Sequence, residues 1–152
     1  MSMVQESVEV EVPLHTAYNQ WTQFEDFPRF MEGVEEVTQI DARHNHWKTR
    51  VGGATREFDT EIVDQMPDQK IAWRTIGGDV QQMGVVTFEP LDAGRTAVRL
   101  AIDFEPEGVA QKAADVMGMV DRRVKGDLRR FKSFIEDRGL ESGAWRGRIT
   151  PS

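Results

Sequence analysis

The chain has 152 residues, of which 39% are hydrophobic and 30% are charged, and it carries a net charge of −7 with no cysteine. This length suffices for one domain with its own hydrophobic core, whereas the lack of cysteine excludes disulfides, a thiolate zinc site and a cysteine nucleophile. The negative charge argues against non-specific nucleic-acid binding, which requires clustered Lys and Arg side chains to displace counterions.

The first third of the chain predicts a strand followed by short helices. Apolar and polar residues alternate from Val4 to Val12, and Pro13, which has no N–H for a ladder, ends this strand. Over residues 14–31 the apolar side chains lie three to four positions apart, which predicts one or two short helices interrupted at Pro28.

The middle of the chain returns to a period of two. Residues 34–104 predict six further strands, separated by stretches rich in turn residues. The polar stretch 41–45 is expected to form the loop of the first hairpin, and Gly52-Gly53 and Gly77-Gly78 are expected to form later turns.

A single apolar stripe predicts a long helix over about residues 108–138, roughly 45 Å long at 1.5 Å per residue. The stripe consists of Ala113, Met117, Val120, Val124, Leu128, Phe131 and Ile135. Gly139 stands where a helix C-terminus is expected. We therefore expect one domain over residues 1–139 and a flexible tail over residues 140–152, from which Trp145 could dock on the body.

This order of elements predicts an α+β fold. A sheet with one apolar face must cover it, and the long helix is the only large amphipathic element available. A strongly curved seven-stranded antiparallel sheet wrapped around that helix buries the apolar face of the sheet and the apolar stripe of the helix together. Because a curved sheet cannot touch a straight helix everywhere, we expect a cavity between them, closed at one end by the short helices.

Five segments of the sequence carry a family resemblance: residues 8–13 (VEVEVP), 21–31 (WTQFEDFPRFM), 67–75 (PDQKIAWRT), 84–90 (GVVTFEP) and 94–98 (GRTAV). They resemble the START-like or SRPBCC superfamily, and specifically its polyketide cyclase/dehydrase and coenzyme-Q-binding branch. The resemblance covers about residues 3–138 and implies the helix-grip fold. The resemblance says little about activity, because relatives include lipid and quinone binders, aromatase/cyclases and a ribosome-association toxin.

The alternation also indicates which side chains face the cavity. The candidates for ligand binding are Phe24, Phe30, Trp47, Arg56, Phe58, Trp73, Phe88, Met117 and Val120. Arg56 shares a strand face with Phe58, so it either reaches solvent at the rim or binds an enolate, carboxylate or quinone oxygen. In one of two possible registers Glu36 faces the same way and pairs with Arg56.

Nothing in the sequence identifies catalytic residues, a metal site or a cofactor. No serine, histidine and acid stand at a recognisable catalytic spacing. His44 and His46 lie two residues apart and could share a strand face, but two imidazoles without a third ligand make a weak metal site. No glycine-rich phosphate loop precedes a helix.

Three functions remain open. The first is non-catalytic binding of a hydrophobic or aromatic small molecule, such as a lipid, quinone or polyketide, in the cavity. The second is a polyketide aromatase/cyclase, which would show several polar groups deep in the pocket. The third is a protein-interaction module that uses Arg122, Arg123, Arg129 and Arg130 on the long helix. We expect a cytoplasmic protein with no membrane span and no nucleic-acid partner, and a homodimer remains open.

Overall fold

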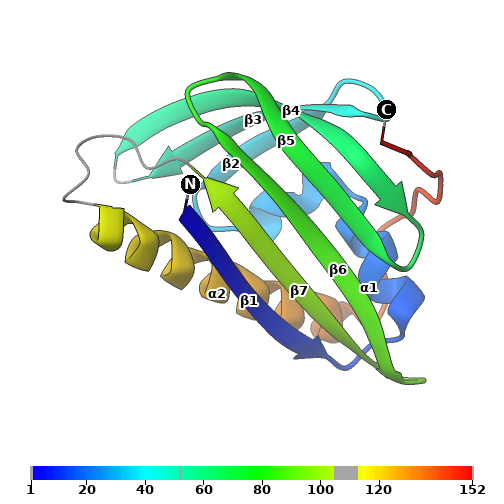
Figure 1. The fold of residues 1–152 in the computed structure, drawn as a ribbon. Helices are drawn as coiled ribbons and strands as arrows, with labels where there is room; N and C mark the ends of the chain where they lie inside the picture. Colours follow the sequence, from blue (N-terminus) through cyan, green and yellow to red (C-terminus); the bar gives the residue numbers. More distant parts are fainter. Residues whose placement is uncertain (1, 52, 105–112, 152) are drawn as a thin grey trace.

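The strands of the chain form one curled antiparallel sheet that grips the C-terminal helix (Figure 1). The computed structural model describes residues 2–51, 53–104 and 113–151. The sheet order is β1-β7-β6-β5-β4-β3-β2. The strands are β1 (Ser2–Val10), β2 (Val34–Gln39), β3 (His44–Val51), β4 (Ala54–Met66), β5 (Lys70–Gly78), β6 (Gln82–Asp92) and β7 (Arg95–Phe104).

Within the described residues, three helical elements complete the fold. Helix α1 (Leu14–Trp21) and the 3₁₀ helix η1 (Phe24–Arg29) follow β1 and lie at one end of the sheet, and helix α2 (Ala113–Arg138) lies along its concave face (Figure 1). This arrangement confirms the predicted α+β helix-grip fold. The expected start of the long helix, residues 108–112, and Gly52 of one expected turn lie outside the described residues.

The structure corrects the predicted loop before β3 and decides between the two registers left open for β2. The hairpin loop is shorter than expected, so Asn45 lies inside β3 with only 1% of its surface exposed. A bulge between Val34 and Glu36 shifts the alternation of β2, so that Glu36 is exposed opposite Lys48 on the outer face. Because Arg56 lies on the inner face, the expected Glu36–Arg56 pair does not form.

The core lies between α2 and the concave face of the sheet. The apolar stripe of α2 supplies Val124, Leu128, Phe131 and Ile135, all of which are almost fully buried. The Phe131 ring meets the Trp21 ring edge-on, with ring centroids 4.9 Å apart. Helix α2 is therefore held by its predicted face, and its packing against Trp21 also positions α1.

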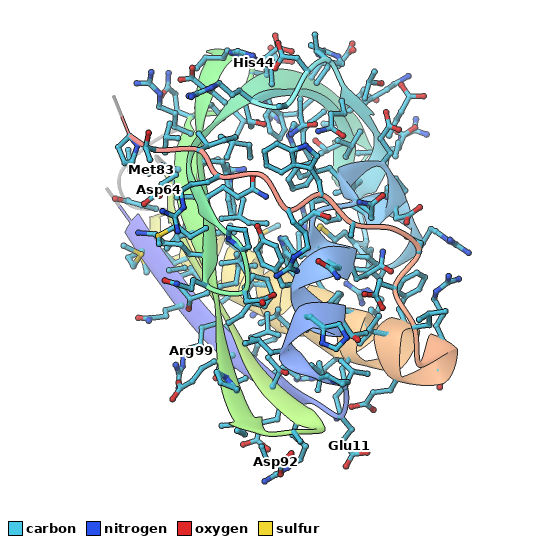
Figure 2. The ribbon with its side chains drawn as sticks, turned by 90° about the vertical axis from the view of Figure 1, so that its right-hand side faces the viewer. Glu11, His44, Asp64, Met83, Asp92 and Arg99 are labelled. Carbon is cyan, nitrogen blue, oxygen red and sulfur yellow. The ribbon has the colours of Figure 1, made fainter. Side chains whose placement is uncertain are left out.

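The segment after α2, for which the sequence predicts a flexible tail over residues 140–152, makes contacts with α1 and β4. Figure 2 shows it running from the end of α2 across α1. The backbone groups of Ile149 and Gln65 exchange hydrogen bonds of 2.8 and 3.0 Å. The segment lies against α1 because two polar residues of that helix, Asn19 and Gln20, are buried and require hydrogen-bond partners.

The tail supplies those partners. Asn19 donates to Glu141 (2.9 Å) and accepts from Arg146 (2.6 Å). The Gln20 side-chain oxygen accepts from the Ser142 backbone N–H at 2.9 Å. The polar side of α1 is therefore covered by residues far along the chain, which no local pattern in the sequence indicates.

Candidate functional site

A cavity of about 500 Å³ lies between the sheet and α2. Sixteen of the 24 described residues that line it are apolar. Six of the nine residues predicted from alternation are on its wall: Phe24, Trp47, Arg56, Phe58, Trp73 and Val120. Their role in ligand binding stays a prediction, but the sequence places them on the correct side of their elements.

The other three candidates lie in the core away from the cavity wall. The Phe30 ring packs against Phe131, with ring centroids 5.2 Å apart. The Phe88 ring packs edge-on against Tyr18 at 5.4 Å. Met117 is partly buried against the core. For Phe30 and Phe88 the pattern correctly indicates an inward direction, but neighbouring rings fill the space that a ligand would need.

Three successive cross-strand pairs of β3 and β4 face the cavity. The pairs, from the β3–β4 turn inward, are Thr49 with Arg56, Trp47 with Phe58, and Asn45 with Thr60. The Trp47 and Phe58 rings are stacked, 5.7 Å apart and 8° from parallel. Along the wall, a pair that contains one cationic side chain is therefore followed by an aromatic pair and then by a neutral polar pair.

The two ends of this wall differ in exposure. Arg56 and Thr49 are partly exposed, as is Arg123 of α2, whereas Asn45 and Thr60 are each 1% exposed. The cationic groups consequently lie at the accessible end of the cavity, and the neutral polar pair lies at the buried end.

Asp127 of α2 adds a buried carboxylate to the wall. Its Oδ1 accepts hydrogen bonds from Arg130 Nη2 at 2.5 Å and from the Glu32 backbone N–H at 3.0 Å. Burial raises the pKa of Asp127, although the Arg130 and Glu32 hydrogen bonds act in the opposite direction. Because Arg130 also donates to the Phe30 carbonyl at 3.0 Å, Asp127 and Arg130 join α2 to the segment that follows η1.

Gly84 of β6 is a site residue that hydropathy patterns do not identify. It lies opposite Trp73 in the sheet, and a Cβ atom at this position would be 2.4 Å from Cζ2 of that ring. Any larger side chain would displace the Trp73 ring, which lines the cavity. The missing side chain of Gly84 thus makes room for an aromatic part of the wall.

Two of the three histidines, His44 and His46, lie on the outer face of the sheet, away from the cavity. His44, at the outer edge of the molecule in Figure 2, lies 2.8 Å from Asp41. His46 is held between Asp59 (2.7 Å) and Glu57 (3.0 Å) of β4. In the described ranges no three His, Cys, Asp or Glu side chains are arranged to hold a metal ion. These contacts instead tie β3 to the turn before it and to β4.

The cluster around His46 predicts a pH-dependent contribution to stability. Hydrogen bonds to Glu57 and Asp59 raise the pKa of His46 above its ordinary value. A raised folded-state pKa adds stability that is complete below the unfolded value of about 6.5 and is lost as the pH rises through the folded value. When the pH is lowered from 8 to 6, we expect the unfolding temperature of wild type to rise more, or fall less, than that of H46Q, as measured by thermal unfolding at both pH values.

The expected difference is small because the His46 side chain is 35% exposed. H15Q is the control, since His15 is exposed on α1 and lies outside this cluster. Identical pH dependence in wild type and H46Q would show that the carboxylates do not stabilise the imidazolium.

The basic face of α2 is only partly available to a partner. Arg130 is paired with Asp127, and Arg123 lines the cavity. Lys125 and Lys132 pair along the helix with Asp121 and Glu136, respectively. Arg122 and Arg129 remain exposed, so the interaction hypothesis rests on fewer charges than the sequence suggests.

Comparisons with known proteins agree with the fold described above. Residues 10–132 match the family model described as polyketide cyclase/dehydrase and lipid transport. An uncharacterized 17.2 kDa protein from Streptomyces lincolnensis, from the melC2-rnhH intergenic region, is 56% identical over 149 residues, which are 98% of this chain and 99% of that protein.

Solved structures share the fold at low sequence identity. The ZhuI aromatase/cyclase from Streptomyces sp. R1128 superposes with a TM-score of 0.76 at 18% identity, covering 95% of this chain and 99% of that one. A START superfamily protein from Mycobacterium smegmatis gives 0.69 at 16% identity, covering 90% and 95%. None of the helices within the described ranges combines the length and the apolar character needed to cross a bilayer.

Proposed function

Because this chain belongs to the polyketide cyclase/dehydrase and lipid transport family, we propose that it binds a largely apolar, aromatic small molecule in the cavity between its sheet and α2. The cavity itself carries the proposal. Its volume of about 500 Å³ lies in the range of small-molecule sites, and apolar side chains with a few polar groups form its wall. The stacked Trp47 and Phe58 rings offer a flat surface that suits an aromatic ligand.

Native mass spectrometry of the purified protein, with a denatured sample alongside, tests this proposal. We expect a bound species of a few hundred daltons that disappears on denaturation, and saturable binding of the fluorescent probe 1-anilinonaphthalene-8-sulfonate. If the protein carries no co-purified molecule and does not bind the probe, the proposal is wrong.

A matched pair of variants shows whether binding uses this cavity. Val120 of α2 lines the cavity, whereas its neighbour Met119 is 53% exposed. We expect V120W, which fills part of the cavity, to weaken probe binding at least tenfold and M119W to leave it unchanged. Equal binding by wild type and V120W would place the probe elsewhere.

A cyclase is the second candidate, favoured by the polar groups Asn45, Thr60 and Asp127 on the buried part of the wall. Cyclisation followed by dehydration forms a ring and releases one water, so the product is lighter than its precursor by that water. A carrier instead releases the molecule that it took up. The same mass spectra distinguish the two functions, because they show whether an added ligand returns unchanged or one water lighter.

A further inference from the structure

The pair at the buried end of the cavity leaves hydrogen-bonding capacity unused. Asn45 lies on the wall, and its buried side-chain oxygen accepts no hydrogen bond from any residue in the described part of the chain. Leaving a buried acceptor unpaired is costly, so native structures nearly always supply a partner. Because Asn45 lines the cavity, a ligand bound there is one source of that donor.

Thr60 has the complementary capacity. Its Oγ1 accepts a hydrogen bond from Trp47 Nε1 at 2.9 Å, which fixes the indole and leaves the hydroxyl proton to be donated. No acceptor for that proton is found among the described residues. The wall therefore offers an unused acceptor, the Asn45 oxygen, and an unused donor, the Thr60 hydroxyl, in addition to the N–H groups of the Asn45 amide.

These two groups are close enough to act on one ligand atom. Asn45 and Thr60 are directly opposite each other in the antiparallel β3–β4 pair, where Cβ atoms lie about 4.5–5.5 Å apart. The terminal torsion of an asparagine is soft, so a modest rotation turns its oxygen toward the cavity. A hydroxyl group seated between them can donate to Asn45 and accept from Thr60 at the same time.

We infer that Asn45 and Thr60 together select a ligand that carries a hydroxyl group, phenolic or enolic, at its buried end. This inference rests on the proposed binding function and adds the chemical class of the ligand and its orientation. Arg56 lies four residues from Thr60 along β4, about 14 Å at 3.4 Å per residue. The hydroxyl-bearing end therefore lies deep in the cavity, and the other end points toward Arg56 with the Trp47–Phe58 stack between them.

Three probes of similar shape test the inference by isothermal titration calorimetry. Naphthalene has no polar group, 2-methoxynaphthalene only accepts hydrogen bonds, and 2-naphthol both donates and accepts. We expect wild type to bind 2-naphthol about tenfold more tightly than 2-methoxynaphthalene, as one added hydrogen bond allows. If naphthalene binds but 2-naphthol gains nothing, the hydroxyl inference is wrong and the binding function stands; if no probe binds, both fail.

Two substitutions separate the donor from the acceptor. N45L should weaken the binding of 2-naphthol only, because only that probe donates a hydrogen bond. T60V should weaken the binding of 2-naphthol and of 2-methoxynaphthalene alike, because both accept one. T60S retains the hydroxyl and should bind as wild type does. T96V is the matched control, since Thr96 is fully buried but lies off the cavity wall. Equal losses for all three probes in N45L would show a structural role for Asn45 and overturn the inference.

Discussion

Replacing Phe131 with alanine is expected to lower the free energy of unfolding by about 3–5 kcal/mol. Phe131 is fully buried where α2 meets the short helices, and its ring packs against Trp21 at 4.9 Å and Phe30 at 5.2 Å. Removing the ring leaves a void that three separate elements line, so the structure cannot collapse into it easily. Urea unfolding followed by circular dichroism measures the loss.

Phe134 provides the control on the same helix. It is only partly buried, and the guanidinium groups of Arg29 and Arg138 lie 5.2 and 5.5 Å from its ring centre. We expect F134A to cost about 1 kcal/mol, since much of this ring already faces water. Similar losses in the two variants would mean that the buried aromatic cluster does not carry the packing between α2 and α1.

The F131A substitution should also affect ligand binding. Trp21 lies between Phe131 and the cavity, because it contacts the former and lines the latter. When Phe131 is removed, the Trp21 ring loses its support and the closed end of the cavity is no longer well defined. Weaker probe binding by F131A than by F134A, measured at a temperature where both are folded, is therefore expected.

Deleting residues 141–152 is expected to destabilise the protein by about 3 kcal/mol, or to lower its Tm by about 6–12 °C for a domain of this size. The deletion removes Ile149, which is 3% exposed, and its backbone hydrogen bonds to Gln65. It also leaves Asn19 and Gln20 without the partners that Arg146 and Ser142 provide. Differential scanning calorimetry of the two chain lengths measures the effect.

Two single substitutions show how the tail acts. I149A should reproduce part of the loss, whereas R148A, at an exposed neighbouring position, should leave the Tm within about 1 °C of wild type. If the shortened chain unfolds at the same temperature as the full one, the contacts of the tail add no net stability. The expectation of a loosely held tail would then be correct in energetic terms.

Hydrophobic periodicity predicts the fold because burial imposes it directly: the stripe from Val124 to Ile135 must face a core, and alternating strands must face the same core. The same reasoning places Trp47, Phe58 and Trp73 on the inner wall. It places Phe30 and Phe88 inward as well, but it does not indicate that other rings surround them.

The sequence by itself therefore determined the order of the elements, the curved sheet around a helix, and the side of each strand that faces inward. Only the tertiary structure decided that Asn45 is buried beside Thr60, that Gly84 accommodates Trp73, and that the tail covers α1. The physical reason is the range of the interactions. Periodicity records a preference for burial that each residue expresses alone, whereas the partner of a polar group or the space left for a ring depends on residues brought close only by folding.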